Sequence, residues 1–455
     1  MAGPRPVTTR RADERMPADK KPQADKGLLP EKALRRGQKP GTEHAPQPNG
    51  TADHPARDSC GALRPFYADL HVHVGRTKDG RPVKISGSRD LTFQGIAAEA
   101  SDRKGMDIVG IIDCHSPAVQ RDIDDCLAAG EMEELSGGGI RYRRTVILIG
   151  AEIEVRDPGL GPAHLLVFMP TLDAMRAFTG WLRPRMKNVE LSSQRLRASA
   201  RELQDEVLAR GGLLIPAHVF TPHRSLYGSC CDRMATLLDA DRVEAVELGL
   251  SADSRMAGYI AELDGKTFLT NSDAHSPGKI GREYNELRLV APTFEEVLKA
   301  IRGEDGRKVA ANYGLDPRLG KYYRSYCAVC GAVLDEGGPV TDRCPRCGRE
   351  NLVRGVLDRI LSIADRPEPF VPASRPPYRY QVPLEFLPGL GRRKLNRLLD
   401  EFGTEMNILH RVSPESLEQA AGRELAELVL AARRGELALA SGGGGRYGRV
   451  LGFSS

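Results

Sequence analysis

From residue 66 to residue 275 the sequence repeats one pattern: an apolar run of strand type ends in a polar residue, and a helical stretch follows. Examples of such runs are 106–112 (MDIVGII), 145–149 (TVILI), 212–218 (GLLIPAH) and 267–275 (TFLTNSDAH). Strands that alternate with helices favour a parallel sheet or an α/β barrel. In a barrel the carboxyl ends of the strands meet at one mouth, so we expect the polar residues there to form one site.

The first run, residues 66–73 (FYADLHVH), ends in two histidines. Because alternate strand residues point to the same face, His71 and His73 project together while Val72 turns into the core. We expect Asp69 to orient one of the two rings, as carboxylates do for metal-ligating histidines. Taken alone, the pair fits a metal site and ordinary structural histidines about equally well.

Further histidines and carboxylates lie at or beside the ends of predicted strands. They are His115, Glu152, His164, His218, Asp273 and His275. A single such histidine is more often a hydrogen-bonded structural residue, but repetition of the placement favours a metal centre. Imidazoles with carboxylates suit zinc, manganese or iron, and this many ligands suits two or three ions. Adjacent divalent ions, with zinc, manganese and magnesium as the candidates, support hydrolysis of a phosphoester.

The length and composition of the chain limit its number of domains, its partners and its compartment. A chain of 455 residues with 40% hydrophobic residues predicts two or three domains, and a net charge of +5 permits a polyanionic partner without requiring one. No apolar stretch is long enough to span a bilayer, and no signal peptide is recognisable, so we expect a cytoplasmic protein with reduced thiols and no membrane partner. Residues 1–60 are rich in charged residues and proline and predict a disordered basic tail. A basic helix is expected over about 186–209.

Four of the nine cysteines form two Cys-x-x-Cys pairs, each followed by a glycine that permits a tight turn. The four are Cys327, Cys330, Cys344 and Cys347. This spacing predicts a closed, tetrahedral structural zinc site within a ribbon over residues 319–366. Whether such a ribbon binds DNA or braces its neighbours is left open by the sequence.

Residues 367–455 are expected to hold a proline-rich linker and a helical module. The segment 386–395 (FLPGLGRRKL) places a glycine-rich turn before a helix that begins with three cations. Backbone amides at a helix N-terminus favour a phosphate, and glycines let it approach closely. The turn resembles a helix-hairpin-helix, a binder of the DNA backbone, with 419–428 as a degenerate second copy; a plain helical bundle is the alternative. The DNA-contacting candidates are Gly389, Gly391, Arg392, Arg393 and Lys394.

The strand-end motifs resemble those of the PHP (polymerase and histidinol phosphatase) domain. The matching residues are 69–73 (DLHVH), Asp113 with His115, Glu152, His164, His218, and 273–275 (DAH). The resemblance implies a distorted (β/α)7 barrel over residues 61–318 that binds up to three metals.

By that resemblance, Glu152 is a bridging ligand, and Glu152, Asp273 and His218 are the catalytic candidates. His71, His73 and Asp273 would help to hold one ion, His164 and His218 a second, and His115 with His275 a third. The third position departs from the family pattern, because residues 74–78 (VGRTK) lack the further histidine that many members carry.

Three longer segments resemble endonuclease Q, a PHP branch that nicks DNA on the 5′ side of deaminated bases. These are 216–222 (PAHVFTP), 247–253 (ELGLSAD) and 271–277 (NSDAHSP). The domain order of barrel, ribbon and helix-hairpin-helix matches as well. The resemblance implies a DNA endonuclease that acts 5′ of uracil, hypoxanthine, xanthine or abasic sites, contacts mainly the phosphate backbone and takes an extruded lesion base into a pocket.

Two other functions fit parts of the same sequence. A PHP site could hydrolyse a small phosphate monoester, although such a substrate needs no DNA-binding module. A non-catalytic DNA-binding protein could retain a decayed barrel, although decay would be expected to remove ligands, and eight plausible ones are present.

Overall fold

The computed structural model describes residues 61–334 and 342–453. The predicted tail, residues 1–60, therefore lies outside the described residues. All described residues belong to one compact unit, 59–455, so the boundaries expected at 318 and 366 stay predictions. Among them, no helix combines the length and the apolar character that crossing a membrane requires.

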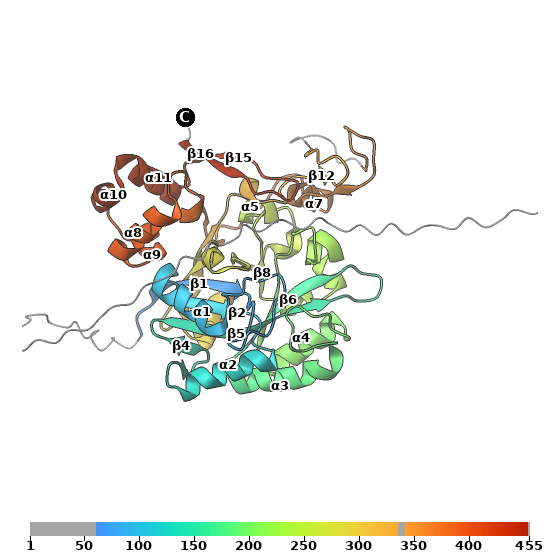
Figure 1. Ribbon diagram of the computed structural model, residues 1–455. Helices are drawn as coiled ribbons and strands as arrows, with labels where there is room; N and C mark the ends of the chain where they lie inside the picture. Colours follow the sequence, from blue (N-terminus) through green and yellow to red (C-terminus); the bar gives the residue numbers. More distant parts are fainter. Residues whose placement is uncertain (1–60, 335–341, 454–455) are drawn as a thin grey trace, which may run out of the picture. The chain divides into compact units, whose positions relative to one another are not determined.

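The barrel is built on one large mixed sheet (Figure 1). Its centre is β1 (Arg64–Val72), which pairs in parallel with β2 (Ile108–Ile111) and antiparallel with β10 (Tyr284–Leu289). β2 pairs in parallel with β5 (Thr145–Val155), as the alternating pattern predicts. The remaining strands of this sheet are β3 (Glu133–Glu134), β4 (Ile140–Tyr142), β6 (Ala163–Met169), β7 (Leu213–Pro216), β11 (Lys308–Gly314) and β14 (Tyr378–Tyr380).

The expectation of parallel strands fails on one side of the barrel. β5 pairs antiparallel with β6, and β6 pairs antiparallel with β7. Only residues 156–162 connect β5 to β6, which is too short for the crossover that a parallel pair needs. β8 (Ala245–Glu247) and β9 (Thr267–Leu269) pair in parallel in a separate two-stranded sheet. The α/β class is confirmed, and the mixed strand directions make the barrel irregular.

Two hydrophobic clusters hold the strands in place. Phe66, Ala68 and Leu70 of β1 point into one cluster with apolar residues of β2 and of strands β5 to β9. Val72 is fully buried in the other cluster, which extends to the covering helices. The prediction that Val72 turns into the core is thus confirmed.

The helices of the barrel begin at side-chain caps. Thr171, Ser199 and Thr293 cap α3 (Leu172–Leu182), α4 (Ala200–Ala209) and α6 (Phe294–Arg302), because each side chain accepts a hydrogen bond from the backbone of the first turn. With α2 (Pro117–Ala128), α3 and α4 cover one side of the barrel (Figure 1). Shorter helices are α1 (Phe93–Ala98), α5 (Ser254–Ala257) and α7 (Val356–Ser362).

The prediction of a helix over 186–209 is wrong for the first half of that range. The capping box of Ser199 with Glu202 starts α4 only at Ala200. Before it, the chain lies along β5, where the backbone N–H of Glu154 donates to Gln194 (3.2 Å) and that of Leu196 donates to Glu154 (2.8 Å). These bonds to a buried strand replace the helical ones, and they bring residues 192 and 193 to the barrel mouth.

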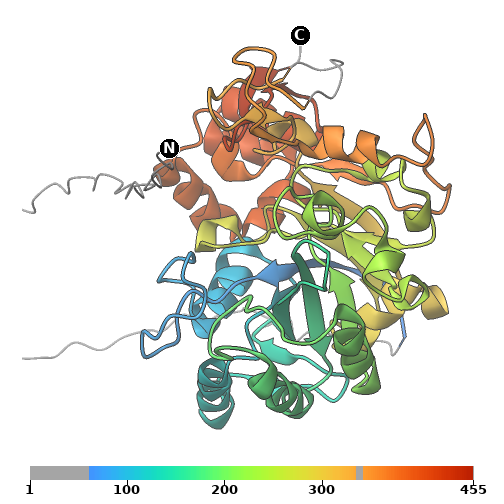
Figure 2. The ribbon, with the colours of Figure 1, turned by 90° about the vertical axis from the view of Figure 1, so that its right-hand side faces the viewer.

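The C-terminal half of the described chain contacts the barrel at several points. β14, in the proline-rich segment that we expected to be extended, adds to the sheet edge beside β11. The helices α8 (Arg392–Phe402), α9 (Glu405–His410), α10 (Pro414–Ala421) and α11 (Arg423–Arg434) form one group, in red and orange in Figure 2. Lys104, next to the barrel sheet, pairs with Glu405 at 2.9 Å. The remaining strands are β12 (Tyr326–Cys327), β13 (Leu352–Val353), β15 (Leu437–Ala440) and β16 (Arg449–Phe453).

Candidate metal centre and active-site cavity

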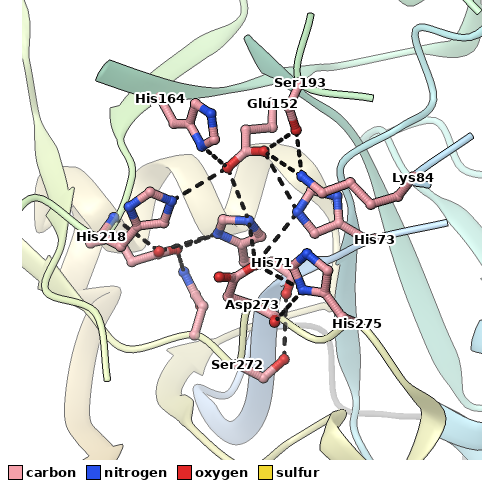
Figure 3. Close-up of polar contacts among 12 residues, drawn as sticks. His71, His73, Lys84, Glu152, His164, Ser193, His218, Ser272, Asp273 and His275 are labelled. Carbon is pink, nitrogen blue, oxygen red and sulfur yellow. Dashed lines mark hydrogen bonds and ion pairs between the residues drawn. The ribbon is translucent and has the colours of Figure 1, made fainter. Parts of the chain in front are cut away.

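Strand ends deliver the predicted ligands to one place (Figure 3). β1 carries His71 and leads directly to His73, and β5 and β6 carry Glu152 and His164. His218 follows β7 by two residues, and Asp273 and His275 follow β9. The structure thus brings together seven of the eight predicted ligands.

Within the described residues the seven form three groups whose ligand atoms lie within 4.8 Å of one another. The groups are His71, His73 and Glu152; Glu152, His164 and His218; and His73, Asp273 and His275. Glu152 belongs to two groups, as a bridging ligand must. Its Oε1 lies 2.7 Å from His164 Nδ1 and 3.4 Å from His218 Nε2, while its Oε2 lies 3.6 Å from His73 Nε2.

The donor atoms fit divalent ions. Nε2 of His71 and Nε2 of His73 are fully buried, and neither has a hydrogen-bond partner among the described residues. Buried polar atoms are nearly always satisfied, so two orphaned imidazole nitrogens beside a carboxylate mark a place that an ion completes. Imidazole and carboxylate together are the ligands of zinc, manganese and iron sites.

The opposite nitrogens of these two rings are held by carboxylates. Nδ1 of His71 lies 2.9 Å from Glu247 Oε2, and Nδ1 of His73 lies 3.1 Å from Asp113 Oδ2. Such partners fix the tautomer and direct Nε2 toward the ion. The expectation that Asp69 orients a ring is wrong: its carboxylate instead accepts hydrogen bonds from the backbone of Ser272 (3.0 Å) and Gly281 (2.8 Å).

Two of the ligands have unusual backbone conformations. His218 has φ of 31° and Asp273 has φ of 45°, in the left-handed region that residues with a Cβ rarely adopt. Each such residue costs roughly 1–3 kcal/mol and persists only where its surroundings impose it. The imposing contact at His218 is the hydrogen bond from its N–H to Glu247 Oε1 (3.0 Å), so Glu247 positions both His71 and His218.

His115 is the predicted ligand that lies outside the three groups. It is fully buried, and its Nε2 lies 3.3 Å from the carbonyl oxygen of Leu191. That contact satisfies one ring nitrogen through the protein itself. A role for His115 in holding a third ion stays a prediction.

Lys84 and Ser193 belong to the site and are not recognisable from the sequence pattern (Figure 3). Lys84 Nζ donates to Glu152 Oε2 (3.1 Å) and to Ser193 Oγ (2.6 Å), and Ser193 Oγ donates to the same carboxylate oxygen. Both residues come from irregular connections, and Ser193 has φ of 52°. A largely buried lysine is rare unless it is paired, and here its partner is Glu152.

The site's charges favour ionised carboxylates. Burial alone would raise the pKa of Glu152, but His164 and Lys84 hold it well below its usual range. The pKa of Asp273 is likewise held well below its usual range, because His71 and His73 outweigh burial. Both side chains are therefore ready to bind cations over the whole physiological pH range.

A cavity of about 870 Å³ opens beside the ligands. Its walls include Glu152, Asp273 and His218 together with aromatic and basic side chains. The latter are Lys279, Arg282, Lys321, Tyr322 and Tyr447. A cavity of this size with cations and aromatic rings suits a polyanion that also carries flat rings.

The four predicted cysteines cluster as expected. Cys327 Sγ lies 3.6 Å from Cys347 Sγ, and Cys330 Sγ lies 3.6 Å from Cys344 Sγ. Gly331 and Gly348 have φ of 69° and 70°, and each donates its N–H to the first cysteine of its pair. The predicted tight turn after each pair is confirmed, and the thiolates converge as a tetrahedral zinc site requires.

The glycine-rich turn precedes α8, as the sequence predicts. Gly389 has φ of 78°, and Gly391 is the residue that precedes the first turn of α8. Arg392, Arg393 and Lys394 are exposed. Gly422, with φ of 81°, is the residue that precedes the first turn of α11. DNA contact by these residues stays a prediction.

Comparison with known proteins gives relatives over most of the chain. A family model described as PHP-associated matches residues 253–305. An uncharacterized protein of Bacillus subtilis, YqxK, is 48% identical over 390 residues, which cover 85% of this chain and all of the relative. An uncharacterized protein of Methanocaldococcus jannaschii, MJ0043, is 35% identical over 252 residues, which cover 51% of this chain and 31% of that protein.

Two solved structures are similar over nearly their whole length. One is the lesion-specific endonuclease PfuEndoQ from Pyrococcus furiosus, with a TM-score of 0.73, 32% identity, and coverage of 85% of this chain and 95% of that one. The other is endonuclease Q in complex with a 27-mer duplex substrate that has an abasic lesion at the active site. It has a TM-score of 0.73, 33% identity, and coverage of 85% and 96%.

Proposed function

The chain belongs to the endonuclease Q family, and we propose on this basis that it is a metal-dependent DNA repair endonuclease. Its substrate would be DNA with a deaminated base, uracil, hypoxanthine or xanthine, or with an abasic site. Cleavage would hydrolyse the phosphodiester on the 5′ side of the lesion and leave a 3′-hydroxyl and a 5′-phosphate. The observation that carries the proposal is the overlap of the three ligand groups with a basic, aromatic cavity in this fold.

Different residues would hold the two ions of the metal centre. His71, His73 and Asp273 would hold one ion and His164 and His218 a second, with Glu152 bridging. When bound, such ions supply a hydroxide near neutral pH and neutralise the charge of the phosphate. Glu247 and Asp113 keep the first two imidazoles in the tautomer that presents Nε2 to the site.

The cations of the cavity would position the DNA. Lys84, Lys279 and Arg282 all line it, so a phosphodiester placed against Asp273 and Glu152 would meet positive charge. Tyr322 and Tyr447 offer flat surfaces for a base that leaves the stack. The turn at Gly389 and Gly391 with the start of α8 would hold the backbone at a distance from the cut.

The test uses end-labelled duplexes that differ only by one uracil, hypoxanthine, xanthine or abasic site, each with Mn²⁺, Mg²⁺ or Zn²⁺. We expect a nick directly 5′ of the lesion, absent from undamaged duplex and from Glu152→Ala, because that change removes the bridging carboxylate. The Glu152→Ala protein should still bind the duplex.

Other results would point elsewhere. Hydrolysis of a simple phosphate monoester without any nick would identify a phosphatase. DNA binding without either activity under all three metals would identify a binding protein. A wild-type activity that survives Glu152→Ala would exclude the metal mechanism.

A further inference from the structure

One side chain at the rim of the cavity has no role in the metal centre. Ile85 is 81% exposed, more than any other exposed large hydrophobic side chain in the described part of the chain. Single exposed apolar residues are common on protein surfaces and need no explanation by themselves. Ile85 differs from such residues in two respects: it lies beside the cavity, and hydrogen bonds fix the turn that carries it.

The turn that carries Ile85 is fixed to the metal centre from both sides. Its closing hydrogen bond runs from the N–H of Gly87 to the carbonyl of Lys84 (2.9 Å). The N–H of Lys84 donates to Val74 (2.9 Å), directly after His73, and the N–H of Ser88 donates to the carbonyl of His275 (2.8 Å). Ile85 therefore projects from a turn that is held by the backbone of His275 and of Val74, the residue after His73.

The neighbours of Ile85 place it beside the cavity. Lys84 and Ser86, on either side of it in the chain, both line that cavity. Arg89 is exposed at the end of the same segment. Figure 2 shows this connection between β1 and α1 as a blue coil. An exposed apolar side chain thus lies between two residues that line the cavity, in a segment that ends in an exposed arginine.

We propose that Ile85 is a wedge that enters the base stack of the DNA at the position left by the lesion nucleotide. The inference rests on the proposed function and adds the residue that keeps the lesion base out of the helix. Extrusion leaves a gap with apolar base faces on both sides, and side chains such as isoleucine fill such gaps in kinked DNA. Arg89 would contact a phosphate that flanks the gap.

The test compares one lesion in two contexts. Ile85→Ala should lower kcat/KM on a duplex with uracil opposite adenine by about 10- to 100-fold, because the wedge offsets the cost of unstacking. On the same uracil in single-stranded DNA, where little stacking is lost, the change should be below about 3-fold. Ile85→Leu should retain most of the duplex activity, because its side chain has a similar apolar volume.

Leu361→Ala is the matched control, because Leu361 is also an exposed aliphatic residue (46%) but lies in α7. It should behave as the wild type on both substrates. Equal loss on duplex and single strand, or no loss with Ile85→Ala, would overturn the wedge.

A second measurement needs no cleavage. A 2-aminopurine placed directly 3′ of the lesion brightens when it loses its stacking partner, and stopped-flow mixing follows this before the strand is cut. The wild type should raise the fluorescence of the duplex, and Ile85→Ala should give a smaller rise at saturating protein. Equal rises would overturn the wedge even if the protein nicks DNA, whereas a rise without any nick would contradict the proposed function and leave the wedge supported.

Discussion

Lys84 is the residue that most changes the view of the site obtained from the sequence. Its ammonium lies 3.1 Å from the carboxylate of Glu152 and lines the cavity, so it adds a fixed positive charge where the phosphate would bind. Coulomb attraction in a site partly closed to water is several times stronger than in bulk water. Lys84 is therefore a positioning residue for the proposed reaction.

Replacing Lys84 tests that role. Lys84→Met should lower kcat for lesion cleavage by about 100-fold, the usual effect of removing one charged group aimed at the reacting centre. Lys84→Arg should restore part of the loss. Lys78→Met is the control, since Lys78 lies on the same connection but is exposed and pairs with Asp125. A loss that appears only in KM would assign Lys84 to DNA binding instead.

The number of bound ions can also be predicted from single residues of the site. Two of the three described groups share His73, so together they suit one ion in the barrel. The group of Glu152, His164 and His218 suits a second ion, and the cysteines suit one more. Mass spectrometry of the loaded protein should therefore find three metal equivalents per chain. His164→Ala should lose one, and His115→Ala none, because His115 lies outside the groups. Four equivalents, with one lost in His115→Ala, would restore the third position that the family resemblance implies.

The ligands were predictable and their supporting residues were not, for a physical reason. His71, Glu152 and His164 lie near the ends of strands and Asp273 follows one, and strand ends meet whatever the details of the loops. Lys84 and Ser193 lie in irregular segments whose course depends on hydrogen bonds to distant strands, such as the one from Ser192 N–H to Val83 (3.0 Å). Local sequence patterns contain no signal for such contacts.

At the scale of elements, α9 contacts the barrel through a histidine as well as through Glu405. The ring of His410 stacks on Tyr67 of β1, with ring centres 4.5 Å apart, and its Nε2 lies 2.7 Å from the hydroxyl of Tyr284 in β10. Burial, with Arg433 and Arg411 nearby, lowers the pKa of His410 to about 4. The folded protein thus keeps this ring neutral at pH values where an unfolded chain would protonate it.

This shift gives a pH dependence with a definite sign. The ordinary pKa of histidine is about 6.5, so the unfolded state binds an extra proton between pH 6.5 and pH 4. The contribution of His410 to the free energy of unfolding is fully present above pH 6.5 and is lost as the pH falls toward 4. Thermal unfolding should show a smaller drop in Tm between pH 7 and pH 5 for His410→Gln than for the wild type. His223→Gln, at a residue on the cavity wall, is the control and should keep the wild-type drop.

The ribbon is an element whose stability we expect to depend on its ion. Its described strands, β12 and β13, have two residues each, which is too little to fold without a cross-link. Cys344→Ser should lose one zinc equivalent and make the ribbon cleavable by trypsin, while metal in the barrel stays bound. An intact ribbon in that variant would mean that protein contacts alone hold it.

At the scale of the whole molecule, two basic regions are expected to share the DNA. The start of α8 offers three exposed cations, and the cavity offers Lys279, Arg282 and Lys321. Each phosphate contact adds nearly one unit to the slope of log affinity against log salt concentration. Affinity for lesion DNA should therefore fall steeply as salt rises.

Replacing the three cations at the start of α8 separates the contributions of the two basic regions to DNA affinity. The variant Arg392→Gln, Arg393→Gln, Lys394→Gln should reduce the salt slope by up to about 3 and weaken binding to damaged and undamaged duplex equally. Cleavage at saturating protein should change little, because these residues lie outside the cavity lining. Arg176→Gln, at an arginine of α3 paired with Asp173, is the control. An unchanged slope would favour a plain helical bundle over a DNA-binding module.

The pairing of β14 with β11 has a consequence for how this chain can be divided. Residues 378–380 lie well beyond the ribbon cysteines in sequence, yet they complete the hydrogen bonding of residues 312–314 in the barrel. A truncated protein that stops before Tyr378 would leave that strand edge bare, and bare edges recruit other chains into aggregates. Anyone who expresses the barrel alone should expect an insoluble product, and joining residues 376–382 back to the fragment through a linker should restore solubility.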